Sequence, residues 1–79
     1  MIDKDKMRFY REAMGWTREG YAELSGYSKE YVSMVESGVR SVSEEYKEKM
    51  KEILFEHSEE VAERAAAFME VLKPRKNVS

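Results

Sequence analysis

The apolar residues of this chain recur at the spacing of helices rather than strands. Near the start, Met7, Tyr10 and Met14 stand three and four residues apart, which predicts one buried stripe on a helix. Val32 and Val35 are three residues apart, so they share a helix face that can be buried. A later stretch repeats the pattern with Tyr46, Met50, Ile53 and Leu54. The pattern therefore predicts an all-α chain.

Small and polar residues divide the stretch from residue 17 to residue 38 into two short helices. Thr17 and Ser28 offer side-chain oxygens that can cap a helix N-terminus. Gly26 and Gly38 can adopt the positive φ that ends a helix at little steric cost. This arrangement predicts a helix–turn–helix. One face of the second helix, residues 28–37, packs on the first, and the other face is free to enter a groove.

A last helix is predicted over residues 58–72, before Pro74. Its apolar band is wide for a helix at the end of a small domain. We expect this band to form a two-fold homodimer contact, the kind most common in oligomers. The alternative is that the whole band packs on its own domain. The residues expected at the dimer interface are Val61, Ala65, Phe68, Met69 and Leu72.

At 79 residues the chain is expected to form one domain, residues 1–79. Within it we expect a four-helix core over 6–55, the C-terminal helix over 58–72 and a basic tail over 73–79. The absence of cysteine excludes disulfide scaffolds, thiolate zinc sites and thiol catalysis. Because nothing resembles a signal peptide or a membrane span, the chain is expected to be a cytoplasmic protein that does not associate with membranes.

Catalysis is not expected. The chain has one histidine, His57, and no motif that pairs a nucleophile with a base, gathers metal ligands or cradles a phosphate. We therefore predict no enzyme activity, no cofactor, no metal site and no small-molecule substrate.

The segment AELSGYSKEYVSMVESG resembles the helix–turn–helix of the phage Cro and repressor family, which includes the controller proteins of restriction–modification systems. The residues that carry the resemblance are Ala22, Gly26, Ser28, Val32, Glu36 and Gly38, and the likeness extends over residues 7–55. It implies a five-helix, lambda-repressor-like DNA-binding domain with the helix–turn–helix at helices 2 and 3. It also implies a transcriptional regulator that binds a palindromic double-stranded DNA operator as a homodimer.

The resemblance assigns roles to individual residues. In this family an arginine of the first helix commonly pairs with a glutamate near the end of the recognition helix, and Arg11 and Glu36 match by position. Arg18 stands where many members carry a glutamine that touches the DNA backbone, and Arg40 stands where a basic residue often grips it. The residues expected to contact the DNA backbone are Arg18, Ser28, Tyr31, Ser37, Arg40 and Ser41.

Residues in the first turns of a recognition helix enter the groove most deeply, so the expected base contacts are Lys29, Glu30, Ser33 and Met34. Lys29 can donate to guanine, Glu30 can accept from cytosine N4, and Met34 can touch a thymine methyl group. The alternative is that Lys29 and Glu30 are ordinary surface charges.

The charge balance keeps a second function open. The chain has 14 basic and 16 acidic residues, a net charge of −2, and residues 1–41 hold seven of each sign. A DNA-binding half is usually basic. A protein-binding helix–turn–helix module, such as an antitoxin or antirepressor, is therefore the alternative function.

Overall fold

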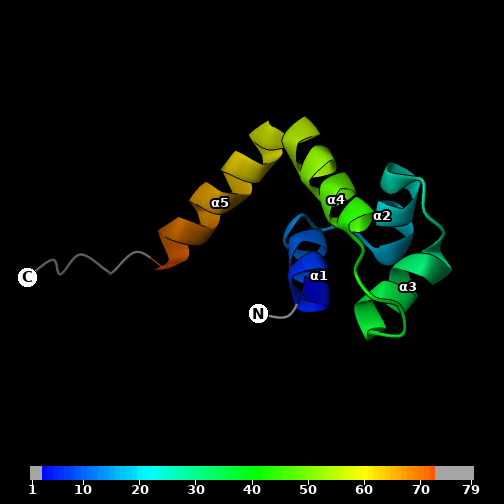
Figure 1. The fold of residues 1–79 in the computed structure, drawn as a ribbon. Coiled ribbons are helices and arrows are strands. Elements are labelled where there is room, and N and C mark those ends of the chain that lie inside the picture. The colour runs from blue at the N-terminus through cyan, green and yellow to red at the C-terminus, as the bar shows by residue number, and fades with distance from the viewer. Residues whose placement is uncertain (1–2, 73–79) are drawn as a thin grey trace, which may run out of the picture.

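The computed structural model describes residues 3–72, and five helices account for most of them (Figure 1). The helices are α1 (Asp3–Ala13), α2 (Arg18–Ser25), α3 (Lys29–Ser37), α4 (Glu44–Glu56) and α5 (Ser58–Leu72). No strand occurs within residues 3–72, and the predicted all-α, five-helix fold is confirmed. The tail predicted at 73–79 lies outside the described residues.

Side-chain caps and glycines set the helix boundaries. The Ser28 hydroxyl accepts a hydrogen bond from the Tyr31 amide at 3.0 Å, at the start of α3. Gly26 ends α2 with a φ of 83°, a left-handed conformation in which an L side chain would be strained. These two residues form the predicted turn between α2 and α3, so the break between the helices is fixed locally.

Gly20 lies inside α2, where glycine costs about 1 kcal/mol relative to alanine. A close approach of a neighbouring helix does not explain it. A Cβ at Gly20 would lie 3.2 Å from the Thr17 hydroxyl oxygen, with no other close neighbour. That hydroxyl accepts the Gly20 amide at 2.9 Å as the cap of α2. Tyr31 and Tyr46 make the equivalent cap contacts with a Cβ present, so the structure gives no steric reason for glycine at this position.

The core lies where α1, α2, α3 and α4 meet (Figure 1). Val32 and Val35 are completely buried, as their spacing predicted, and Tyr21, Tyr46 and Met50 fill the space around them. Burial of large apolar side chains contributes roughly 1.5–3 kcal/mol each. This cluster therefore supplies most of the energy that holds α3 against the other helices.

One part of the predicted α1 stripe is wrong. Met7 and Met14 are buried, but Tyr10 is 36% exposed and Arg11 is buried in its place. At 3.6 residues per turn, Met7, Tyr10 and Met14 lie within about 60° of the helix circumference, with Tyr10 on one side of Met7 and Arg11 on the other. The buried face is centred on Met7 and Met14 and is rotated toward Arg11, which leaves Tyr10 at its edge. Tyr10 instead lies at the edge of α1 toward α5.

The last helix, α5, projects from the bundle. It meets α4 at a corner and diverges from it, with α1 below the opening (Figure 1). None of its residues is buried. Arg64 ties its first half to α1 by donating to the Ala13 carbonyl at 3.2 Å. The second half of the helix leaves its apolar side chains in solvent.

Candidate nucleic-acid interface

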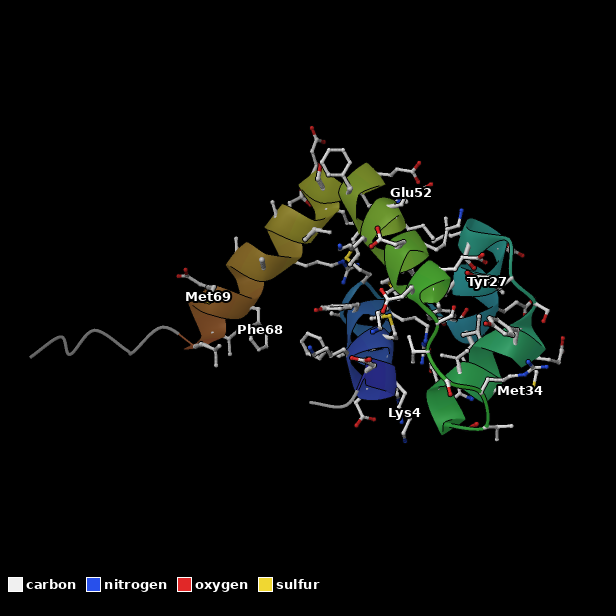
Figure 2. The ribbon with its side chains drawn as sticks, in the orientation of Figure 1. Lys4, Tyr27, Met34, Glu52, Phe68 and Met69 are labelled. Carbon is white, nitrogen blue, oxygen red and sulfur yellow. The ribbon has the colours of Figure 1, made fainter. Side chains whose placement is uncertain are left out.

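The outer face of α3 is open. Lys29 and Glu30, in its first turn, are exposed, and Ser33 and Met34 are partly exposed. Figure 2 shows Met34 on the side of α3 that faces away from α4. All four predicted base-contact residues thus belong to one accessible helix surface, opposite the buried Val32 and Val35. The helix can present lysine, carboxylate, hydroxyl and thioether groups to a partner at the same time.

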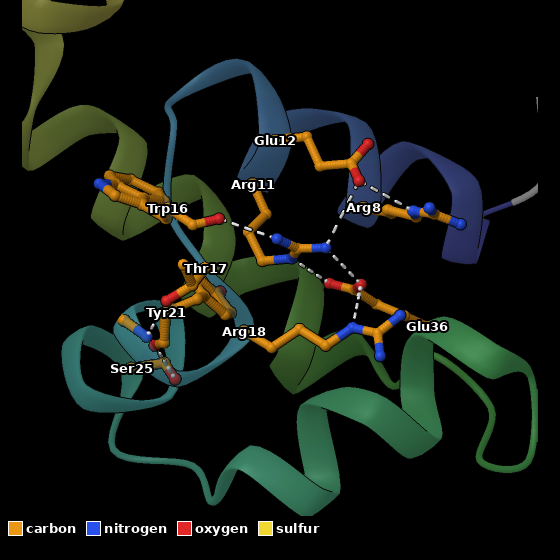
Figure 3. Close-up of polar contacts among 10 residues, drawn as sticks. Arg8, Arg11, Glu12, Trp16, Thr17, Arg18, Tyr21, Ser25 and Glu36 are labelled. Carbon is orange, nitrogen blue, oxygen red and sulfur yellow. Dashed lines mark hydrogen bonds and ion pairs between the residues drawn. The ribbon is translucent and has the colours of Figure 1, made fainter.

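A buried ion pair joins α3 to α1. Arg11 donates from Nε to Glu36 Oε2 at 2.6 Å and from Nη2 to Glu36 Oε1 at 2.8 Å (Figure 3). Its third nitrogen, Nη1, donates to the Trp16 carbonyl at 2.8 Å. The two side chains are only 8% and 1% exposed. The hydrogen bonds to Glu36 raise the pKa of Arg11, so the pair stays charged and holds one orientation.

Arg18 also contacts Glu36, which the sequence did not predict. Its Nε lies 3.2 Å from Glu36 Oε1, so two arginines from two helices share one buried carboxylate (Figure 3). The side chain of Arg18 is still 42% exposed. The only signal in the sequence was an arginine where the family often has glutamine, and it was interpreted as a phosphate contact alone. Glu36 therefore engages Nε of Arg18, while Nη1 and Nη2 make no hydrogen bond within residues 3–72.

A shallow concavity of about 450 Å³ lies beside this cluster, between α1 and the starts of α2 and α3. Its basic lining residues are Arg8, Arg11, Arg18 and Lys29, and its acidic ones are Glu12 and Glu19. Arg8 was not predicted, because its position in the sequence does not distinguish it from an ordinary solvent-exposed arginine. It pairs with Glu12 at 3.2 Å. Thr17, Arg18 and Glu19 also line it, so the N-terminus of α2 borders this region, and helix N-termini attract anions.

The loop after α3 lies at the opposite end of the exposed α3 face from Lys29. Arg40 and Ser41 are exposed, and the Ser37 hydroxyl donates to the Met34 carbonyl at 3.2 Å. Lys4 of α1 extends over this end of α3, since its Cδ and Cε would lie 3.4 Å from a Cβ at Gly38. Lys4 could not be predicted at this site, because α1 and this loop are brought together only by packing.

The Tyr31 side chain packs against the core on one side and is partly exposed on the other. Its ring packs against Tyr27 and Tyr46, with centroids 5.0 and 6.0 Å apart, while the residue is only partly buried. Ser28, another residue expected at the backbone, uses its oxygen to cap α3 and retains a hydroxyl proton to donate. Ser28 and Tyr31 therefore serve mainly to stabilise the helix–turn–helix.

The residues expected at the dimer interface fall on two sides of α5. Val61, Ala65 and Phe68 line a groove between α5 and α1. Figure 2 shows Phe68 pointing into the angle between these helices and Met69 on the outer side of α5. Leu72 is 58% exposed at the end of the helix. The alternative, in which the band packs fully on its own domain, does not describe this arrangement.

His57 closes α4, with its Nδ1 2.8 Å from the Ile53 carbonyl and its ring edge against Trp16. Within residues 3–72, no three histidine or acidic side chains are grouped as metal ligands. No helix in the same range is long and apolar enough to cross a membrane.

The comparisons with known proteins identify the family. A family model described as helix-turn-helix matches residues 7–61, which include α2, α3 and the whole basic concavity. Searches of curated proteins and of solved structures find no match. The matched segment covers well over half of the chain and contains the observed turn, its caps and the buried arginine–glutamate pair. This chain belongs to the Cro/C1-type (XRE) helix-turn-helix family of DNA-binding transcriptional regulators.

Proposed function

We propose that this protein binds a palindromic operator as a homodimer, with α3 of each subunit in the major groove. The observation that carries the proposal is the open face of α3 beside a basic concavity. Lys29 lies on both, so one side chain can connect base recognition with phosphate binding. The two recognition helices would then enter half-sites about one helical turn, or 34 Å, apart.

The proposed base contacts follow from side-chain chemistry. Lys29 donates to guanine O6 and N7, Glu30 accepts from cytosine N4, and Ser33 and Met34 complete the contact one turn later. Glu30 also repels phosphates, which disfavours binding in any register that leaves it without a cytosine. Specificity in this proposal therefore comes partly from a penalty on wrong sequences.

The proposed backbone contacts lie at the two ends of α3. Arg18 at the first end and Arg40 at the other grip phosphates, with Ser37 and Ser41 adding hydroxyl or amide donors. Ser28 and Tyr31 can add hydroxyl contacts next to the Arg18 end. Few phosphate contacts per subunit suffice if two subunits bind together, because the contacts of a dimer act in one binding event. By occupying a promoter, such a dimer would block or recruit polymerase, and it would act in the cytoplasm.

The second candidate is a protein-binding module such as an antitoxin or antirepressor. One observation favours it: Glu30 is exposed on α3, and residues 1–41 hold seven acidic and seven basic side chains. A protein partner with a mixed charge pattern would fit this surface without the electrostatic penalty that DNA imposes on Glu30.

Selection from a pool of random double-stranded oligonucleotides separates the two functions. We expect a palindromic consensus and a dissociation constant that rises steeply with salt, because DNA binding by cationic side chains releases counterions. A pool that yields no enriched sequence, together with flat salt dependence, would overturn the regulator and support the protein-binding module.

A further inference from the structure

A groove between α1 and α5 remains without a function in the DNA-binding surface. It encloses about 590 Å³ and is lined mainly by apolar side chains: Phe9, Tyr10, Met14, Leu54, Val61 and Phe68. An apolar cavity of about 150 Å³ holds one benzene molecule, so this groove has room for three or four large side chains. We propose that it receives α5 of a second copy of this chain, and that the second copy receives α5 in return.

The proposal rests on the homodimer of the proposed function and adds to it the residues of α1. If α5 alone made the dimer contact, only the apolar side chains of α5 would take part. A reciprocal insertion also uses Phe9 and Tyr10, which are 50% and 36% exposed on the facing wall. The partner helix would thus touch two helices of each subunit rather than one.

The far half of α5 has the properties of an inserted helix. Between Arg64 and the end of the helix, Glu70 is the only charged residue, and Phe68, Met69 and Leu72 are each more than half exposed. A helix of about 15 residues is marginal in water without a packed face. The exposed apolar side chains therefore indicate a partner surface that is itself apolar, and the groove is such a surface.

The residues that follow α5 do not suit the groove. Residues 73–79, KPRKNVS, contain three basic side chains and one aliphatic residue, Val78. Such a segment cannot fill an apolar space of this size without burying unpaired charge. The apolar side chains of α5 from another copy fit the groove better. In such a dimer, α5 of each subunit forms a wall of its own groove and also inserts into the groove of the partner.

The available area is consistent with a dimer. A large aromatic side chain carries about 150–250 Å² of surface, so each half-exposed Phe, Tyr, Met or Leu here offers roughly 100 Å². The five such residues on α1 and α5 supply roughly 500 Å² per subunit, or about 1,000 Å² for the pair. That is the lower bound for a specific interface, and Val61, Leu54 and the alanines of α5 add to it.

A consequence for DNA recognition follows from the position of α1. Tyr10 is adjacent to Arg11, which holds Glu36 of α3 through two hydrogen bonds. A partner helix packed on Phe9 and Tyr10 would fix α1, and α1 would fix the orientation of the recognition helix. The distance between the two recognition helices would then depend on the groove.

Sedimentation equilibrium of the full chain without DNA tests the proposal. We expect a species of twice 9.3 kDa at micromolar concentration. Phe68→Ser on α5 and Phe9→Ser on α1 should each raise the dimer dissociation constant about tenfold or more, as truncating a central aromatic does. Phe55→Ser is the matched control: Phe55 is 80% exposed on α4 and does not line the groove, so dimerisation should be unchanged.

Two results would overturn the proposal. One is a single 9.3 kDa species at all concentrations tested. The other is a dimer that Phe68→Ser weakens and Phe9→Ser does not, which would mean that α5 pairs without α1. Because Phe9 is half exposed, its truncation should leave the α-helical circular dichroism spectrum of the folded chain unchanged at 25 °C. A dimer that responds as expected but selects no DNA sequence would overturn the proposed function and leave the groove contact supported.

Discussion

Arg11 and Glu36 are 25 residues apart in the chain and meet through two parallel hydrogen bonds of 2.6 and 2.8 Å. Each oxygen of the carboxylate accepts one nitrogen of the guanidinium, and Arg18 adds a third contact at 3.2 Å. A buried pair of this kind contributes little net stability, because desolvation offsets the attraction. Its effect is geometric: it fixes α3 against α1 and α2 in one orientation.

Removing Glu36 should therefore affect folding and DNA binding together. In Glu36→Ala, two arginines lose the carboxylate that neutralises them, and Arg11 is left charged in a buried position. Such a loss costs about 3–5 kcal/mol, a large part of the roughly 4–12 kcal/mol expected for a domain of this size. Thermal and urea unfolding should show the loss, and operator affinity measured well below the melting temperature should fall.

Arg8→Ala provides the control for this experiment. Arg8 pairs with Glu12 at 3.2 Å, but both side chains are 53% exposed. Exposed pairs contribute about 0–1 kcal/mol, so the melting temperature should change little. If Glu36→Ala unfolds at the same temperature as the parent chain, the pair does not orient α3.

Lys29 should control sequence preference. In Lys29→Ala, the donor to guanine is lost while the fold is retained, because Lys29 is exposed and its side chain caps nothing. We expect a loss of about 1–3 kcal/mol on the preferred operator and relaxed preference at one base pair of each half-site. Repeating the selection with the variant measures both. An unchanged consensus would place Lys29 outside the base-reading surface.

Arg40 and Arg18 should control the salt dependence instead. Each removed phosphate contact lowers the slope of log K against log salt by about one unit per subunit. Arg40→Ala should flatten this slope without changing stability, since the exposed side chain of Arg40 has no salt-bridge partner in the described residues. Arg18→Ala should flatten the slope and also lower the melting temperature slightly, because it contacts Glu36. Identical slopes for parent and variants would argue against both phosphate contacts.

Stability should decline in alkali because of two buried tyrosines. The hydroxyls of Tyr21 and Tyr46 have no hydrogen-bond partner among residues 3–72. Burial raises the pKa of both above the usual value of about 10. The stability they provide is fully present below pH 10 and is lost as pH rises, because only the unfolded chain releases these protons. Two groups give a slope of about −2.7 kcal/mol per pH unit above pH 10.

Urea unfolding between pH 9 and pH 11.5, followed by circular dichroism, measures this slope. In Tyr21→Phe the slope should be shallower by roughly 1.4 kcal/mol per pH unit, the contribution of one buried tyrosine. At pH 7 the same variant should lose less than about 1 kcal/mol, since the hydroxyl has no protein partner to lose. An unchanged slope would show that Tyr21 ionises as readily in the folded protein as in the unfolded chain.

Features that depend on neighbouring residues could be predicted from the sequence. Thr17, Ser28 and Ser43 cap helices through amides three residues away, and Gly26 and Gly38 end helices through their own positive φ. These effects need no distant contact, so the boundaries of the helix–turn–helix follow from local chemistry. The open face of α3 follows as well, because the spacing of Val32 and Val35 determines which side is buried.

Tertiary structure alone decided the contacts between helices. Tyr10 lies on the predicted stripe of α1, yet it faces the groove toward α5, because the buried face of α1 is rotated toward Arg11. Arg18 turns to Glu36, and Lys4 reaches Gly38, because packing brings together helices whose separation no local pattern encodes. The spacing of residues along a helix determines which of its faces is apolar, but the angle between two helices, and therefore which side chains meet, depends on the packing of the whole core.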